Sequence, residues 1–362
     1  MNIIAFISGI VLILIMLGDA FETIVLPRRV SRRIRFARLF FRLSWRSWLT
    51  VARMIKKNPL RDTFLGFFGP LSVIMLIILW ATGLIIGFAF LHWSFGTIEK
   101  TPEGIGTYIY LSGTTFYTLG LGDVVPDTAI GKGLVAFEAG LGFGFLGLVI
   151  SYLPLLNQSF ARREIAVALL DAHAGSPPTA AEMLLRHIHQ SDLTELNRHF
   201  QEWERWSAEL LESLLSYPML AFFRSHHDNQ SWLGSLTAIL DTSAFIMAGA
   251  EINRTDQPHF TFTMIRHTLV DLSQIFNCPP LRRETSRLTR SDLEKIVSLL
   301  APTGLELFPI DILEKNLSEF RQMYEPYVYS LAEHLHVTLP SWISEAELNE
   351  KANESMASSR NP

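Results

Sequence analysis

Three long apolar runs constrain the fold of this chain more than any other feature of its sequence. They occupy residues 2–26, about 69–93 and about 133–157. A helix of about 25 residues is roughly 37 Å long, which is enough to cross the hydrocarbon core of a bilayer with some tilt. Because a backbone in lipid must satisfy its own hydrogen bonds, we expect three membrane-spanning helices.

The first run has a secretory signal peptide as its alternative interpretation. A signal peptide needs a basic segment before the apolar run and a small-residue cleavage site after it. Here Asn2 precedes the run, and Pro27, Arg28 and Arg29 follow it. We therefore predict a retained N-terminal transmembrane helix over residues 1–27.

Charge is distributed unevenly, although the net charge of the chain is only −4. Residues 28–61 contain twelve Lys or Arg and no acid, whereas residues 162–362 contain seventeen basic and twenty-seven acidic side chains. Basic segments next to membrane spans stay on the cytoplasmic side. This rule predicts an outside N-terminus and a cytoplasmic C-terminal half.

The segment between the second and third runs is too short to form two full membrane crossings. It extends from Ile105 to Pro126, so it should enter the membrane and return to the same face. Irregular backbone at membrane depth is tolerated only where it is buried in protein or lines water. The segment therefore predicts an aqueous path.

Glycine occupies every second position near the end of this loop, in Thr118-Leu119-Gly120-Leu121-Gly122-Asp123. Because only glycine adopts positive φ without a steric cost, this spacing lets the backbone alternate in handedness and direct successive carbonyls at one axis. Residues 105–117 should form a helix whose C-terminal partial negative charge faces that axis. The alternative is a glycine-rich turn that joins two helices by chance.

This hexapeptide resembles the T-V-G-Y-G-D selectivity filter of the tetrameric potassium channel superfamily, and the resemblance extends over about residues 69–157. It implies an all-α membrane protein whose pore module, residues 63–160, comprises a span, a pore helix, the filter and an inner helix. The family's K⁺ ligands correspond to the carbonyls of Thr118, Leu119, Gly120 and Leu121 and to the Thr118 hydroxyl, with Asp123 at the outer mouth. One loop per chain implies a homotetramer or assembly with a relative. The resemblance also implies a bacterial protein of the inner (plasma) membrane.

Leu121 departs from the family pattern, which usually has tyrosine there. The hydroxyl that braces the filter is then missing at this position. Filters of the G-L-G type occur in some two-pore-domain potassium channels, so K⁺ selectivity remains our prediction. A non-selective monovalent cation channel is the nearest alternative.

The third apolar run contains candidates for gating and for support of the filter. Its glycines permit either close helix packing or a gating hinge, and Pro154 is suited to kink the helix at a lower gate. Glu138 lies inside the run, where it either accepts a hydrogen bond from Tyr117 behind the filter or faces water at the outer mouth. The candidates are Tyr117, Glu138, Gly140, Gly144 and Pro154, with Gly142 and Gly147 as further small residues.

Residues 28–62 have the pattern of a basic amphipathic helix lying on the anionic cytoplasmic leaflet. The arginines of one face fall within about 80° on a helical wheel: Arg28, Arg32, Arg35, Arg42, Arg46 and Arg53. The opposite face is apolar and contains Ala37, Phe40, Phe41, Trp48, Val51 and Ile55.

A voltage-sensing helix is the alternative for this segment, because Arg29, Arg32, Arg35 and Arg38 repeat every third residue. Such a helix needs acidic partners on several neighbouring spans, and only Asp19 and Glu22 on the first run are available. We favour the interfacial helix and expect Asp19 and Glu22 to pair with its arginines.

The C-terminal half predicts an all-helical cytoplasmic domain over residues 161–346, with seven or eight helices between proline and glycine breaks. Ser291 and Glu294 fit a capping box. Residues 234–252 are apolar enough for a fourth span, but Asp241 in their middle favours a buried core helix. Residues 347–362 are predicted to be disordered.

Ten of the eleven histidines lie in this half. A metal site would need two of them on one helix face, and the pair His187 and His189 does not share one. His267 and Asp271 are four residues apart, so their side chains could pair on a helix. A pH sensor built from these histidines is supported only by their number. We found no nucleotide-binding glycine fingerprint.

Together these features predict a potassium-selective homotetramer gated through its cytoplasmic domain. We predict no catalytic residue, no cofactor, no metal other than permeant K⁺ and no nucleic-acid partner. The expected partners are anionic lipids at residues 28–61 and an unidentified cytoplasmic ligand. A membrane-tethered signalling or enzymatic domain is the alternative from another functional class. A potassium-transporter subunit normally needs four pore loops per chain, and this chain has one.

Overall fold

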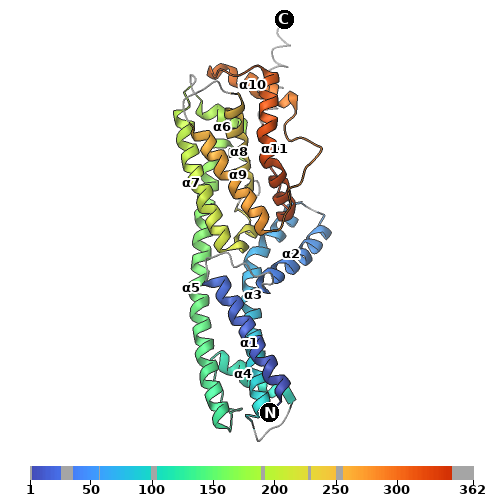
Figure 1. The fold of residues 1–362 in the computed structure, drawn as a ribbon, viewed down its shortest axis with the longest axis vertical. Helices are drawn as coiled ribbons and strands as arrows, with labels where there is room; N and C mark the ends of the chain where they lie inside the picture. Colours follow the sequence, from blue (N-terminus) through green and yellow to red (C-terminus); the bar gives the residue numbers. More distant parts are fainter. Residues whose placement is uncertain are drawn as a thin grey trace. The chain divides into compact units, whose positions relative to one another are not determined.

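The structure is a computed structural model that describes residues 2–25, 36–56, 58–98, 104–188, 192–226, 230–249 and 256–344. Over these ranges it consists of α-helices and short 3₁₀ helices, with no β-strand, which confirms the predicted all-α class. The chain divides into two compact units (Figure 1). The first comprises residues 1–159 with 216–223, and the second comprises residues 160–215 with 224–362.

The four helices that carry the predicted pore module and first span are α1 (Ile3–Ile24), α3 (Asn58–Phe95), α4 (Gly104–Phe116) and α5 (Ala129–Ala174). By length and composition α1, α3 and α5 are each able to cross a membrane. Both α3 and α5 are longer than the apolar runs at 69–93 and 133–157. Polar sequence beyond an apolar run does not end a helix, and α5 continues through Pro154 without a break.

Helix α1 lies directly against α3 in the first unit (Figure 1). Glycines allow this approach: a Cβ added at Gly9 would lie 2.7 Å from the Gly87 carbonyl oxygen, and one at Gly83 would lie 2.7 Å from the Met16 side chain. Trp80 and Phe88 of α3 fill the interior beside this contact and are almost completely buried. Small residues at helix contacts are typical of membrane helix packing.

Helix α2 (Phe36–Met54) packs its aromatic face against the first turns of α3 rather than leaving it free for lipid. Trp48 stacks on Phe64 at 4.4 Å between ring centroids, and the Trp45 ring lies 4.7 Å from Phe68. Trp45 also contacts Phe222 of η1 (Pro218–Phe222) at 4.9 Å. Trp48, on the predicted apolar face, is therefore partly covered by the extension of α3.

The arginine face of α2 is exposed at Arg42, Arg46 and Arg53. Arg28, Arg32 and Arg35 lie outside the described residues, as do the arginines before residue 36 that we expected to pair with Asp19. In the described part, both Asp19 carboxylate oxygens accept from the Ala37 amide at 3.0–3.1 Å, and the Trp80 indole donates to Asp19 at 2.9 Å. This buried carboxylate thus ties α1 to the start of α2 and to α3.

The second unit contains six described α-helices after the end of α5: α6 (Ala180–His187), α7 (Thr194–Ser216), α8 (Trp232–Gly249), α9 (Gln257–Ile275), α10 (Arg290–Leu300) and α11 (Ile310–Leu335). The short helix η2 (Ala301–Thr303) follows α10. Three of the proline-containing breaks that divide this half, at residues 175–178, 279–280 and Pro340, fall between helices. The predicted capping box is wrong by two residues: Thr289 is the N-cap of α10 and Asp292 completes the box.

Helix α8 forms the centre of this unit and packs against α9 and α11 (Figure 1). Its composition and length are those of a membrane span, but 94% of its apolar window is buried inside the protein. Asp241 in its middle pairs with Arg287, with nitrogen–oxygen distances of 2.7 and 3.0 Å, and accepts a hydrogen bond from Tyr324. Burial alone would lower the pKa of Arg287, but Asp241, Tyr324 and Glu325 raise this pKa above its usual value. This environment supports the predicted core helix.

Candidate functional site

Backbone handedness alternates along the loop that follows α4. Thr118 has φ 56°, Gly120 has φ 56° and Gly122 has φ 81°, whereas Leu119 and Leu121 between them are not left-handed. A left-handed conformation is unusual for a threonine and inexpensive for the two glycines. The loop therefore has the alternation that the spacing of its glycines predicts.

The amide groups of this loop are held by the C-terminal end of α4. Leu119 N donates to the Thr114 carbonyl oxygen at 2.8 Å, and Gly120 N donates to the same oxygen at 3.3 Å. In a trans peptide the carbonyl points opposite to the amide of the next residue. The carbonyls of Thr118 and Leu119 therefore point away from α4, where they are free to bind a cation.

All six residues from 118 to 123 are exposed on the single chain. Leu119 and Leu121 are 62% and 63% exposed, and Tyr117 beside them is 55% exposed. Leucine side chains as exposed as these are stabilised when another apolar surface covers them. The loop is thus available both to a permeant ion and to neighbouring protein.

A tyrosine of the preceding helix holds Asp123 in place. The Tyr110 hydroxyl donates to Asp123 Oδ2 at 2.7 Å, across thirteen residues of sequence. Sequence reasoning missed this contact, because only the return of the loop beside α4 brings the two side chains together. Tyr110 thereby braces the C-terminal end of the hexapeptide, where Leu121 has no hydroxyl to do so.

Glu138 of α5 is completely buried and joins three helices behind the loop. Ser112 of α4 donates a hydrogen bond to Glu138, and His92 Nε2 of α3 lies 3.4 Å from Glu138 Oε2. The predicted hydrogen bond from Tyr117 and the alternative water-exposed position are therefore both wrong. His92 is buried too, with Nδ1 3.0 Å from Thr97 Oγ1.

Among the four α5 glycines named above, Gly142 makes the close contact. A Cβ on Gly142 would lie 2.0 Å from the Phe116 carbonyl oxygen, so α5 passes directly against the end of α4. Gly140, Gly144 and Gly147 have nothing within 4 Å of such a Cβ. Of these four glycines, Gly142 thus has the packing role, and its partner is the end of α4.

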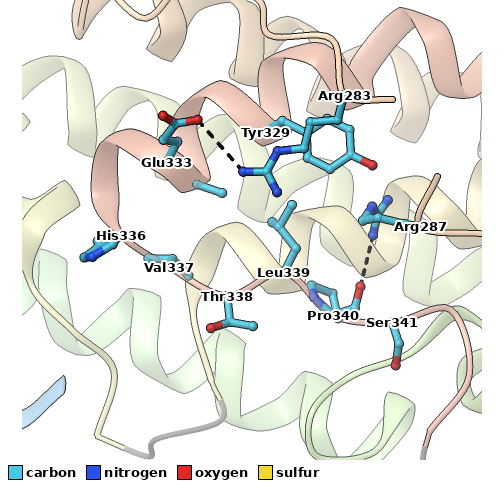
Figure 2. Close-up of a pocket in the computed structure, with 11 residues that line it drawn as sticks. Arg283, Arg287, Tyr329, Glu333, His336, Val337, Thr338, Leu339, Pro340 and Ser341 are labelled. Carbon is cyan, nitrogen blue, oxygen red and sulfur yellow. Dashed lines mark hydrogen bonds and ion pairs between the residues drawn. The ribbon is translucent and has the colours of Figure 1, made fainter. Parts of the chain in front are cut away.

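A pocket of about 540 Å³ lies in the second unit, remote in sequence from the loop. Figure 2 shows it at the end of α11, beside the chain from His336 to Ser341. Arg283 approaches Glu333 at 3.9 Å, and Arg287 donates to the Pro340 carbonyl at 3.1 Å. Because the local cations are already partnered, this pocket offers no evident chemistry for a charged ligand.

Comparison with protein families matches residues 73–155 to a model described as "Ion channel". The matched region begins within α3 and ends within α5, so it contains the loop, α4, Glu138 and Gly142. The same chain gave no match among curated proteins or among solved structures.

Proposed function

We propose that this chain is one subunit of a homotetrameric, potassium-selective channel, because residues 73–155 match an ion-channel family. In this proposal, four copies of residues 118–123 surround one axis. The carbonyls of Thr118, Leu119, Gly120 and Leu121 then replace the hydration shell of K⁺.

The observation that carries this proposal is the alternation of φ at Thr118, Gly120 and Gly122, combined with amides tied to Thr114. The amides face the helix end, and so the carbonyls are presented on the other side. The C-terminus of α4 adds a partial negative charge of roughly half an elementary charge near the same path. Both features favour a cation over an anion.

Assembly of four chains is supported by the large apolar side chains that remain exposed on α5. Phe137, Phe143, Leu146 and Ile150 are each more than half exposed, and only 17% of the apolar window of α5 is buried. Some of this surface would face lipid, and the rest would face neighbouring subunits.

Selectivity for K⁺ over Na⁺ is supported by the contacts that hold the loop in place. Tyr110 holds Asp123, and the buried Ser112, Glu138 and His92 hold α4, α5 and α3 together behind the loop. These contacts provide rigidity that Leu121 does not. A non-selective channel is the second candidate, favoured by the absence of a hydroxyl at position 121.

Reversal potentials of the reconstituted protein under opposing K⁺ and Na⁺ gradients distinguish the two candidates. We expect the potential to follow the K⁺ gradient; equal permeability to the two ions would refute selectivity.

The variant Gly120→Ala tests conduction itself. A left-handed alanine costs about 1–2 kcal/mol in backbone energy, so we expect K⁺ flux to be lost while the chain remains assembled. Gly106→Ala is the matched control, because Gly106 lies in α4, has no positive φ and has open space around a Cβ. Absence of K⁺ flux in the wild-type chain would favour the tethered-domain alternative, and unchanged flux in Gly120→Ala would refute the assignment of residues 118–123 as the ion path.

The remaining parts of the proposal concern location. We place the protein in a bacterial inner membrane, with its N-terminus outside, α2 near anionic lipid and the second unit in the cytoplasm, where it gates the pore. The exposed Arg42, Arg46 and Arg53 support the lipid contact.

A further inference from the structure

Three histidines from different helices meet in the second unit. They are His173 in the last turn of α5, His187 at the end of α6 and His199 in the second turn of α7. One ring nitrogen of each lies within 4.8 Å of the others. Sequence reasoning considered only histidines that share one helix face, and therefore did not find this cluster.

The spacing of these nitrogens is close to that of ligands on one small metal ion. His173 Nδ1 lies 3.0 Å from His187 Nε2, and the ring centroids of the three histidines are 4.1–5.1 Å apart. Tetrahedral Zn²⁺ with Zn–N bonds of about 2.0–2.1 Å places its ligand nitrogens about 3.4 Å apart. Small side-chain rotations would bring the three nitrogens to that distance.

His187 is already oriented as a metal ligand would be. Its Nδ1 lies 2.9 Å from the Met183 carbonyl oxygen. A carbonyl only accepts hydrogen bonds, so Nδ1 carries the proton and the lone pair of Nε2 points into the cluster. A backbone carbonyl that fixes the tautomer in this way is the usual outer-shell arrangement of metal-binding histidine.

His199 supplies an independent observation that points to a ligand. It is only 4% exposed, and in the described part of the chain neither of its ring nitrogens has a hydrogen-bond partner. The nearest carboxylates are those of Glu202, 3.6 Å from Nδ1, and Glu195, 4.0 Å from Nε2. A buried polar group without a partner is costly, and a metal ion would bind its lone pair.

The charges around the cluster also suit a divalent cation. The carboxylates of Glu195 and Glu202 lie beside the cluster on α7, and Arg198 is nearby. Because these groups carry two negative charges and one positive charge, the net charge beside the cluster is negative. The side chains of Glu195 and Glu202 are 49% and 63% exposed, so either is able to approach a fourth coordination position.

We propose that His173, His187 and His199 form a binding site for a divalent transition metal, Zn²⁺ in the first instance, with a fourth position left to water or a glutamate. Three imidazoles suit Zn²⁺ and neighbouring first-row ions rather than Mg²⁺ or Ca²⁺. Bound metal would hold the end of α5 against α6 and α7. The site does not depend on the proposed conduction.

The test is Zn²⁺ binding to the full-length chain, purified in detergent with any affinity tag removed. We expect one Zn²⁺ per chain by elemental analysis after exchange into metal-free buffer, and an increase in melting temperature with added Zn²⁺. The variants His187→Gln and His199→Gln should each lower affinity by more than about 100-fold, since loss of an outer-shell partner alone costs 10–100-fold. His267→Gln is the matched control, because His267 is 61% exposed and lies in α9 away from the cluster.

Absence of Zn²⁺ binding in the wild-type chain would overturn the proposal, as would equal affinity in a chain with all three histidines replaced by Gln. If the variants do not fold, Co²⁺ binding to the wild-type chain decides. Visible absorption of tetrahedral Co²⁺ that Zn²⁺ abolishes would support the site, and its absence would refute it.

Discussion

Gly142→Ala tests how the inner helix supports the candidate filter. The new Cβ would lie 2.0 Å from the Phe116 carbonyl oxygen and 2.8 Å from the carbonyl carbon. Ordinary contact begins near 3.4 Å, so α5 and the end of α4 must separate by about 1.4 Å. Both neighbours are backbone atoms, which means that no side-chain rotation can relieve the clash.

Two opposing effects set the size of the change in stability. Overpacking costs about 1–3 kcal/mol, whereas replacing glycine by alanine within a helix gains up to about 1 kcal/mol. We therefore expect a net loss of about 1–2 kcal/mol, or a decrease in melting temperature of about 2–4 °C per kcal/mol. K⁺ flux should fall too, because Thr114 on the displaced helix end holds the amides of Leu119 and Gly120.

The assay is thermal unfolding of the purified chain in detergent, followed by K⁺ flux in liposomes. Gly133→Ala is the matched control on the same helix, since its Cβ would meet nothing within 4 Å. If Gly142→Ala matched Gly133→Ala in both measurements, the contact between α5 and the end of α4 would not have the role assigned to it.

Three further predictions concern other parts of the chain. Trp45→Ala should lower stability by about 3–5 kcal/mol, because Trp45 is buried between Phe68 and Phe222; an unchanged melting temperature would contradict this packing. Arg287→Ala should cost about 3–5 kcal/mol in denaturant titration, since it leaves the buried Asp241 without its counter-charge; a loss below 1 kcal/mol would count against the pair. Burial raises the pKa of Cys278 to about 11. Alkylation of this thiol at pH 8 should therefore be about 200-fold slower than alkylation of a free cysteine, and its rate should increase about tenfold per pH unit towards pH 11. A rate equal to that of free cysteine would show that the thiol is accessible.

Much of the first unit could be predicted because its signals are local. An apolar run long enough for a bilayer predicts a helix wherever it occurs, and glycines at alternate positions predict alternating backbone handedness. The φ angles of Gly120 and Gly122 agree with that prediction. The start of α3 at Asn58 and the end of α5 at Ala174 were not predictable in the same way, because the more polar sequence that borders each apolar run continues the helix.

Partners of buried polar groups depended on packing instead. Glu138 lies 26 residues from Ser112 and 46 from His92, and nothing in the local spacing distinguishes Ser112 from Tyr117 as its partner. The packing of Trp45 against Phe68 and Phe222 was also not predicted from the sequence, because it depends on neighbouring helices. Helical periodicity shows which residues share a face, but the neighbouring element decides which of them become buried.

The sequence by itself determined the apolar helices, the loop with its alternating glycines, and the separation of a basic segment from an acidic helical half. Each of these depends on residues close together in the chain. Only the tertiary structure decided that Gly142 meets Phe116, that Tyr110 holds Asp123, and that three histidines converge. Those contacts join distant helices, and their geometry exists only after the helices have packed.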